Sequence, residues 1–242
     1  MRSLFFLVLP LTFVSCGLFF GSSTSDNKGE FQNILGSDRG WYIKEREIEV
    51  LLDAKIGALR IRHVKMNSNI CISGEIHHIE MDGPIGPDSS EAMKKLLENI
   101  PKCMNSEGTR YVTKVYMNSG GGLLEDGYEM GRLFRKVGVK GVITSGQRCA
   151  SSCAIAFLGS NFRAMFHDAE ILFHAPYTKI SERTIDCSDK REKRDLKRYF
   201  VFALNEENGN FLHKRTMDYC SNISGWVLNA DGAKLFGITN SE

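Results

Sequence analysis

The sequence lacks an excess of charge of either sign. Its 242 residues include 31 Lys and Arg against 29 Asp and Glu, which gives a formal net charge of +2. A protein that binds nucleic acid usually presents a basic excess or stripe that neutralises phosphates. No such feature stands out, so we expect no nucleic-acid partner.

Paired metal-ligand motifs and a phosphate-binding loop are also missing. Cys149 and Cys153 are four residues apart, but no second Cys or His pair follows at metal-ligand spacing, so no zinc site is predicted. The glycine-rich segment at residues 118–122 is not followed by Lys and then Ser or Thr, as in a P-loop. We therefore expect neither a metal nor an organic cofactor.

Residues 1–21 have the layout of an export signal. Arg2 is a short positive region, and residues 4–20 are almost wholly apolar. This run is close to the roughly 17–25 residues that span a bilayer, so a retained membrane anchor is an alternative to a cleaved leader. The segment around Cys16 resembles the lipobox of bacterial lipoproteins, in which the Cys is acylated, although Phe13 stands where Leu is usual. The expected location is outside the cytoplasm, periplasmic or anchored to the membrane.

The composition of residues 22–40, rich in Ser, Gly, Asp and Asn, predicts a polar tether, which leaves residues 41–242 for one full-sized domain.

Of the seven cysteines, six lie in this domain. An even number of cysteines in an oxidising compartment predicts disulfides, but every pairing stays open. These six are Cys71, Cys103, Cys149, Cys153, Cys187 and Cys220.

Apolar periodicity predicts strands and helices in alternation. Strands are predicted from near Ile48 and over residues 58–64, 70–76, 111–117, 142–144 and 169–173. Helices are predicted from Asp88 or Ser89 with an apolar face that includes Ile100, and over residues 123–137, 150–159 and 188–219. The charged run 190–197 is expected to be a solvated face. Asn229 caps a last short helix that Gly237 stops. Strand–turn–helix units in succession predict an α/β fold with a largely parallel, buried sheet.

Three features of this pattern suggest chemistry only when they are taken together. The glycine turn at residues 118–122 precedes a helix, so its N–H groups are placed to hold an anion or an oxyanion. Ser151 and Ser152 open an apolar helix, where capping would be their ordinary role. His174 lies at the end of an apolar strand, where parallel α/β folds place reactive groups. His167, by contrast, lies in a turn without such a pattern. Oxyanion donors, a nucleophile and a base are together the parts of an acyl-transfer site.

These segments resemble motifs of the Clp protease proteolytic subunit, in the same order. Asn-Ser-Gly-Gly-Gly at 118–122 is similar to the family's Asn-Ser-Pro-Gly-Gly, and Ala-Ser-Ser at 150–152 resembles its nucleophile segment. Phe-His-Ala-Pro at 173–176 is similar to Ile-His-Gln-Pro, and residues 228–238 resemble the family's Leu-Ser-Ala through Tyr-Gly-Leu. The likeness covers residues 71–238, and the Cys-x-Ser-x-Cys form is similar to a group of exported Clp-like bacterial proteins.

The resemblance implies a ClpP/crotonase-type superhelix of strand-strand-helix units and a serine peptidase activity. It implies Ser151 as nucleophile and His174 as general base, with the N–H groups of Gly121 and Ser152 as the oxyanion hole. Ser152 is the alternative nucleophile. The resemblance further implies a homo-oligomer that acts on peptides or unfolded proteins. An exported protein would not meet the cytosolic ATPases that serve this family.

Two positions depart from the family pattern. Gly225 stands where the acidic member of the catalytic triad is expected, so the third member is unknown, with Asp218 and Asp231 as weak candidates. Gly120 replaces the family's proline, which loosens the oxyanion turn. A Ser-Lys dyad, as in related signal-peptide peptidases, finds no lysine at a matching place. The alternatives to a peptidase are an inactive or weakly active Clp-fold envelope scaffold and a crotonase-type acyl-CoA enzyme.

Overall fold

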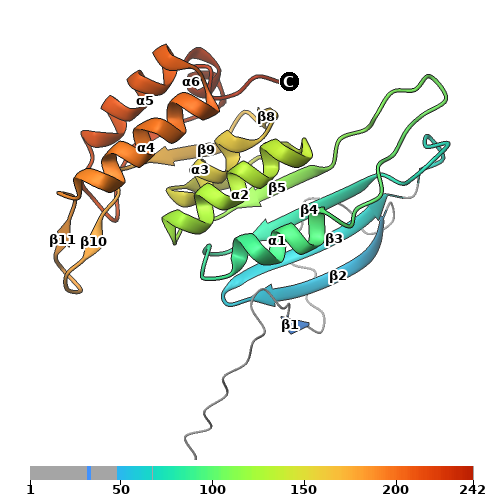
Figure 1. Cartoon of the computed structure of the whole chain (residues 1–242), viewed down its shortest axis with the longest axis horizontal. Helices are drawn as coiled ribbons and strands as arrows, with labels where there is room; N and C mark the ends of the chain where they lie inside the picture. The colour runs from blue at the N-terminus through green and yellow to red at the C-terminus, as the bar shows by residue number, and fades with distance from the viewer. Residues whose placement is uncertain (1–31, 34–47, 67, 242) are drawn as a thin grey trace, which may run out of the picture.

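The computed structural model describes residues 32–33, 48–66 and 68–241. The predicted leader at 1–21, with Cys16, and nearly all of the predicted tether at 22–40 lie outside these residues. The described part is an α/β fold in which helices α1, α2 and α3 lie beside a twisted sheet, while α4, α5 and α6 gather near β9 (Figure 1). The predicted fold class is confirmed.

The main sheet has seven strands in the order β1-β2-β3-β4-β5-β6-β8. Strands β1 to β4 pair antiparallel, and β4, β5, β6 and β8 pair parallel. The parallel half is where the strand–turn–helix units were predicted, because a parallel pair needs a crossover connection. The strands are β1 Gln32–Asn33, β2 Ile48–Ile56, β3 Leu59–Met66, β4 His77–Asp82, β5 Lys114–Asn118, β6 Lys140–Ile143 and β8 Phe162–Met165.

A second sheet and the helices complete the described fold. In this sheet β9 pairs parallel with β7 and antiparallel with β12. A hairpin of β10 and β11 projects beyond the helices (Figure 1). The strands are β7 Arg148–Ala150, β9 Glu170–Phe173, β10 Thr178–Lys179, β11 Ile185–Asp186 and β12 Trp226–Leu228. The helices are α1 Ser89–Leu97, α2 Leu124–Val137, α3 Ser152–Gly159, α4 Lys190–Ala203, α5 Glu206–Met217 and α6 Ala230–Leu235.

Helix α3 is the centre of the core. All of its residues are buried, as expected of a helix that is apolar on every side. Helix α2 packs against it through small residues, because Gly127 lies against Ser152 and Gly131 against Gly159. This close contact holds the first turn of α3 at a fixed place relative to the sheet.

The structure corrects three of the predicted elements. Residues 70–76 are not a strand, and the strand of this region is β4. The apolar alternation there is misleading because Ile70 and Ile72 are 48% and 73% exposed. Helix α1 ends at Leu97, so Ile100 lies beyond it. The predicted helical region at 188–219 is two helices, since Asn205 caps α5 by accepting a hydrogen bond from the Asn208 N–H.

The six cysteines of the domain form three disulfides, as their even number predicted. The pairs are Cys71–Cys103, Cys149–Cys153 and Cys187–Cys220. The second of these joins two cysteines only four positions apart in the sequence, on either side of Ser151. Disulfides persist mainly in oxidising compartments, so this set is typical of a protein outside the cytoplasm.

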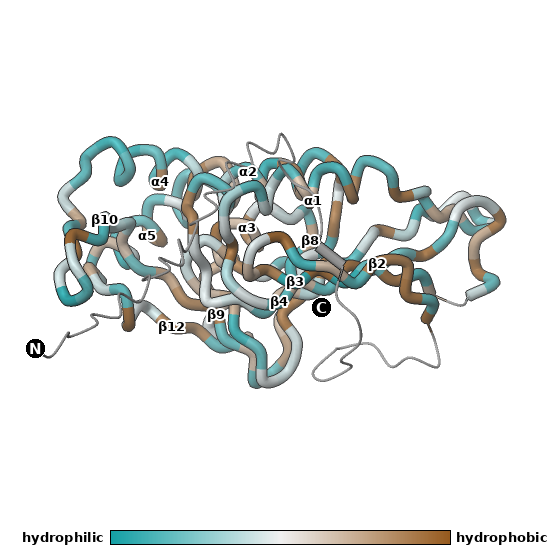
Figure 2. The backbone as a smooth tube through the Cα atoms, turned by 90° about the horizontal axis from the view of Figure 1, so that it is seen from below, coloured by the Kyte–Doolittle hydropathy of each residue, from teal (hydrophilic) through white to brown (hydrophobic). Residues whose placement is uncertain are grey.

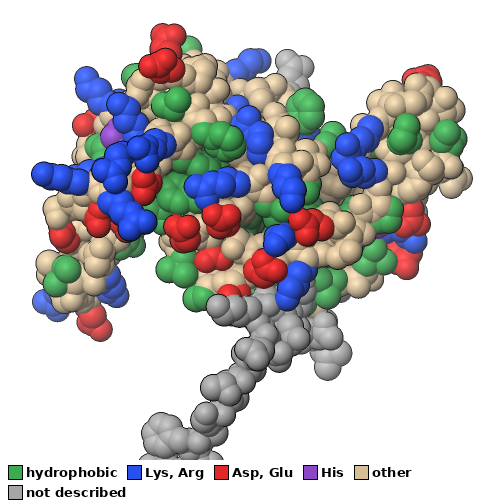
Figure 3. Space-filling model, in the orientation of Figure 1, with side chains coloured by type: hydrophobic (Ala, Val, Ile, Leu, Met, Phe, Trp, Pro, Cys, Tyr) green, Lys and Arg blue, Asp and Glu red, His purple; other side chains and the backbone are tan. Residues whose placement is uncertain are grey.

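The surface of α4 is charged, as predicted for residues 190–197. Lys and Arg side chains gather over this helix in Figure 3. Hydrophilic residues also follow α1 and α2 along the same side of the molecule (Figure 2). Among the described residues, no helix has both the length and the apolar character needed to cross a bilayer.

Buried histidines on β3 and β4 should make the fold sensitive to acid. Burial lowers the pKa values of His63 and His78 to about 4, so both are neutral in the folded protein. The unfolded chain binds these protons below its pKa of 6.5, and stability is therefore lost as the pH falls from 6.5 towards 4. At pH 5 we expect a loss of about 2 kcal/mol for each histidine.

Urea unfolding at pH 7 and pH 5 measures this loss. A double variant, His63→Gln and His78→Gln, should show a much smaller difference between the two pH values, whatever its absolute stability. An equal difference in both proteins would assign the acid sensitivity to other groups.

Candidate active site

Ser151 lies at the junction between β7 and α3. Its φ of 56° is in the left-handed region, which non-glycine residues rarely adopt. The Ser151 N–H donates to the Leu172 carbonyl at 2.9 Å, which fixes the junction to β9. The side chain lines a cavity of 530 Å³. A residue with a strained backbone that lines a cavity at the start of a helix is a typical arrangement for a nucleophile.

The glycine turn lies directly against Ser151. The Ser119 N–H donates to the Arg148 carbonyl at 2.8 Å, and the Ala150 N–H donates to the Ser119 carbonyl at 2.9 Å. These bonds bring Gly121, whose φ is 95°, beside Ser151. A Cβ on Gly121 would lie 2.6 Å from the Ser151 Cβ. The close approach therefore requires glycine at this position.

The two predicted oxyanion donors differ in their hydrogen bonds. The Ser152 N–H is in the first turn of α3, so it has no partner within the helix. The Gly121 N–H donates to the Ser119 hydroxyl at 3.1 Å. The Gly121 N–H would have to exchange this bond before it could bind an oxyanion. Gly122, the next residue of the turn, lines the cavity.

Ser152, the alternative nucleophile, points away from the cavity. Its side chain is fully buried, and its hydroxyl oxygen has no hydrogen-bond partner. A Cβ on Gly127 of α2 would lie 2.9 Å from the Ser152 Cβ, so this side chain faces the helix contact. The geometry therefore favours Ser151 over Ser152.

His174 follows the last residue of β9 and lines the same cavity as Ser151. Its Nδ1 is 2.8 Å from the Ala175 carbonyl oxygen. A carbonyl only accepts, so Nδ1 carries the proton and Nε2 is the basic nitrogen. Burial lowers the pKa of His174 below its ordinary value of 6.5, and the bond to Ala175 partly opposes this shift. The imidazole is therefore neutral at neutral pH and able to accept a proton.

The two side chains share a cavity without a direct bond. Within the part of the chain that the structure describes, no hydrogen bond joins the Ser151 hydroxyl to the His174 imidazole. Catalytic hydrogen bonds are often long in an empty site and shorten when substrate binds. The Tyr177 ring lies beside His174, with 5.5 Å between the ring centroids.

Neither weak candidate for the third triad member lines the cavity. Asp218 is exposed and pairs with Arg215 at 3.3 Å, while Asp231 lies on α6 and lines a different cavity. Gly225 lies against β9, where a Cβ would be 2.5 Å from the Phe173 carbonyl oxygen. An aspartate at position 225 would therefore clash with β9 in this conformation.

The cavity lining combines apolar and polar groups. Lys179, Glu192 and Asn222 are in its lining, and the sequence pattern did not single them out. Burial and the nearby Asp189 raise the pKa of Glu192. The apolar part of the lining consists of Ile85, Leu123, Leu124, Ile155, Phe173 and Leu196.

The α/β fold that carries this glycine turn, serine and histidine is of the ClpP type. No family profile matches the sequence, and no curated protein matches it. Solved structures do match. A mutant of a membrane-bound stomatin-specific protease has a TM-score of 0.50 and 13% identity, over 67% of this chain and 76% of that chain. Another mutant of that protease, in complex with a substrate peptide, has a TM-score of 0.51 and 15% identity, over 67% and 72%.

A mutant of ClpP1 from Listeria monocytogenes has a TM-score of 0.50 and 18% identity, over 67% of this chain and 88% of that chain. At these identities the likeness shows the fold alone. It confirms the fold that the sequence motifs implied, and the roles of Ser151 and His174 remain predictions.

Proposed function

We propose that this chain is a serine peptidase that works outside the cytoplasm, with Ser151 as nucleophile and His174 as general base. The single observation that supports this most is one cavity lined by both side chains, with the glycine turn packed against Ser151. The fold, which is that of known proteases, supports the same reaction class. No metal or organic cofactor is required by this mechanism.

The proposed reaction proceeds through an acyl-enzyme. The Ser151 oxygen attacks the carbonyl carbon of the peptide bond while His174 Nε2 takes the hydroxyl proton. The oxyanion forms beside the Ser152 N–H at the positive end of α3, and the Gly121 N–H is the proposed second donor. His174 then gives the proton to the leaving amine. Water, deprotonated by the same nitrogen, then attacks the ester, and His174 returns that proton to the Ser151 oxygen as the carboxylic acid product leaves.

The lining of the cavity suggests the substrate. Its apolar walls, formed in part by Ile155 and Leu196, favour peptide segments with apolar side chains next to the scissile bond. Short or unfolded peptides fit an exported protein without an ATP-driven unfoldase. The neighbour described as membrane-bound makes membrane-protein segments a second source of such peptides. We also propose a homo-oligomer, tethered through the leader or a lipid on Cys16.

Labelling with a fluorophosphonate probe tests this function. We expect the full chain to be labelled on one serine, because an activated hydroxyl attacks phosphorus and displaces fluoride. Ser151→Ala should abolish labelling, and Ser152→Ala should leave most of it, because Ser152 faces α2. Labelling that persists in Ser151→Ala would assign the nucleophile elsewhere.

An envelope scaffold without activity is the second candidate. It is favoured by the absence, among the described residues, of a carboxylate hydrogen-bonded to His174. A folded wild-type chain that the probe does not label would favour this scaffold over the peptidase. For the crotonase-type acyl-CoA enzyme, no observation on the described residues adds support.

A further inference from the structure

A main-chain carbonyl occupies the place where a triad carboxylate would act. The Ala175 carbonyl oxygen accepts the hydrogen bond from His174 Nδ1 at 2.8 Å. In a Ser-His-Asp triad the carboxylate holds the imidazole in the same tautomer and orientation. A carbonyl is neutral, so it orients the ring but stabilises the imidazolium less than a carboxylate does. The position of the Ala175 carbonyl oxygen therefore matters more than the position of a carboxylate would.

One segment, residues 219–226, fixes that position from both sides. The Ala175 N–H donates to the Tyr219 carbonyl at 2.9 Å. On the other side of His174, Phe173 pairs with Trp226 in the β9–β12 ladder. The segment is thus attached to the chain immediately before and immediately after the base. A shift of residues 219–226 would therefore move Ala175, the residue whose carbonyl orients His174.

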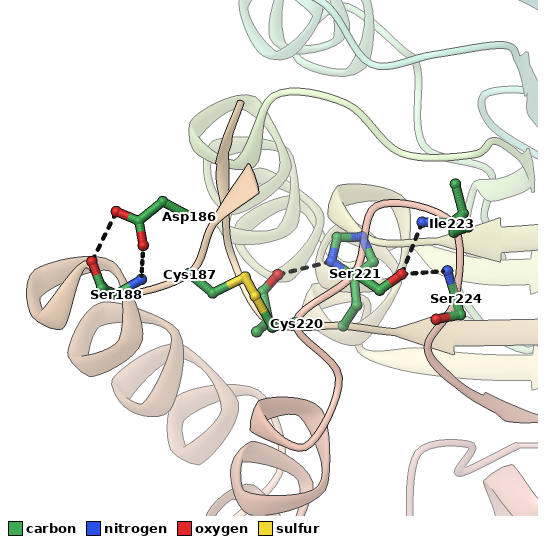
Figure 4. Close-up of a disulfide and its surroundings, with 9 residues drawn as sticks. Asp186, Cys187, Ser188, Cys220, Ser221, Ile223 and Ser224 are labelled. Atoms are coloured by element: carbon green, nitrogen blue, oxygen red, sulfur yellow. Dashed lines mark hydrogen bonds between the residues drawn. A yellow bond between two sulfur atoms is a disulfide. The ribbon is translucent and has the colours of Figure 1, made fainter. Parts of the chain in front are cut away.

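The segment is itself held by local hydrogen bonds and by a disulfide (Figure 4). The Ser221 hydroxyl oxygen accepts from the Ile223 N–H at 3.2 Å and from the Ser224 N–H at 3.0 Å. Cys220, next to Tyr219, is bonded to Cys187. Asn222, between these anchors, lines the cavity. The segment therefore forms a short, tightly held loop beside the base.

Local hydrogen bonds also surround Cys187, the other cysteine of this disulfide. Beside Cys187, Asp186 accepts hydrogen bonds from the N–H and the hydroxyl of Ser188, both at 2.8 Å (Figure 4). Asp189 then caps α4, the helix from which Glu192 enters the cavity lining. The Cys187–Cys220 bond thus ties the loop that supports His174 to the helix that forms a wall of the cavity.

We propose that the Ala175 carbonyl and the Cys187–Cys220 disulfide together form a positioning device that replaces the missing acid of the triad. The carbonyl holds the tautomer with Nδ1 protonated, and the disulfide keeps the 219–226 segment where it supports that carbonyl. This inference rests on the proposed function, because it assigns a role to the same base. It also predicts the tautomer of His174, which can be measured without any reaction.

The experiment compares two variants of the full chain, each of which lacks one of the three disulfides. In the first, Cys187→Ala and Cys220→Ala remove the positioning bond. In the matched control, Cys71→Ala and Cys103→Ala remove a bond with nearly the same sequence separation, 32 residues against 33. By chain entropy the two should lose similar stability. Two readouts are made on each folded protein: the tautomer of His174 by ¹⁵N NMR, and the rate of fluorophosphonate labelling.

We expect the wild type and the control to show His174 with Nδ1 protonated and to label at rates within about threefold of each other. The Cys187→Ala, Cys220→Ala variant should show a mixture of tautomers and label at least about tenfold more slowly, as orienting groups in triads have large effects. The charged groups of the cavity, Lys179 and Glu192, are unchanged in both variants.

Each contrary result has one meaning. A wild type in the expected tautomer that does not label would overturn the peptidase and leave the positioning device standing. An unchanged tautomer and rate in the Cys187→Ala, Cys220→Ala variant would overturn the positioning device alone. If that variant does not fold, Ser221→Ala, which keeps the disulfide but loses two hydrogen bonds of the loop, should show a smaller change in the same direction. No change there would also overturn the proposal.

Discussion

Replacing His174 with alanine is expected to lower kcat/KM for peptide hydrolysis by about 10³-fold or more. A positioned general base typically contributes 10²–10⁴-fold, and the proposed mechanism uses His174 Nε2 in both acylation and deacylation. Because burial holds the pKa of His174 below 6.5, the acid limb of kcat/KM in the wild type should have its midpoint below that pH. The measurement is the pH profile of peptide hydrolysis for wild type and variant.

His167→Ala is the control for this prediction. His167 lines a different cavity, next to α6, so its loss should change kcat/KM by less than about twofold. Added imidazole should restore part of the activity of His174→Ala, because the truncation leaves space in a cavity of 530 Å³. Equal losses in the two histidine variants would show that His174 is not the base.

Strands β5 and β6 of the main sheet and β9 of the second sheet could be predicted because their signals are local. Each is a short apolar run between turns, and β5 and β6 are each followed by a turn and an apolar or amphipathic segment. Strand β8 was not predicted, and β4 was placed too early in the sequence. The glycine turn also has a local signature, since Gly121 and Gly122 have positive φ. Residues 70–76 show the limit of this reasoning, because alternation alone does not reveal which side chains are buried.

Residue type and place in the sequence singled out the proposed nucleophile and base, but not the groups that hold these two residues in position. Ser151 and Ser152 are adjacent and chemically identical in sequence, and only the contact with Gly127 of α2 separates them. The acceptor of the His174 proton is the main-chain oxygen of Ala175, and a backbone carbonyl has no sequence signature. A search for an acidic side chain therefore led to Asp218 and Asp231, which lie elsewhere.

The disulfide pairing could not be predicted from the sequence, for a related reason. Cys187 and Cys220 are 33 residues apart, and the bond between them depends on how α4 and α5 fold back on each other. The composition of the chain gave the number of cysteines and, through the export signal, the expectation that they are oxidised. Which cysteine meets which is decided by tertiary packing, and so is the relation of the Cys187–Cys220 bond to His174.

A second large effect is expected at the contact between α2 and α3, where Gly159→Ala should destabilise the fold. Ala is the better helix former by about 1 kcal/mol, so helix propensity alone predicts a gain. A Cβ on Gly159, however, would lie 2.2 Å from the Gly131 carbonyl oxygen and 2.4 Å from its Cα. These are backbone atoms that cannot rotate away, so the two helices would have to separate. Overpacking of this kind typically costs about 1–3 kcal/mol and occasionally more, and here we expect a net loss of at least about 2 kcal/mol.

Urea unfolding of the oxidised protein measures this loss, with Gly86→Ala as the control. Nothing lies within 4 Å of a Cβ on Gly86, so that variant should stay within about 0.5 kcal/mol of the wild type. Because α3 begins beside Ser151, separating it from α2 should also displace the nucleophile from the glycine turn and slow fluorophosphonate labelling. Gly159→Ala with wild-type stability and labelling would mean that the helices are not in contact at this point, and the placement of Ser151 would then have to be explained by its bonds to β9 alone.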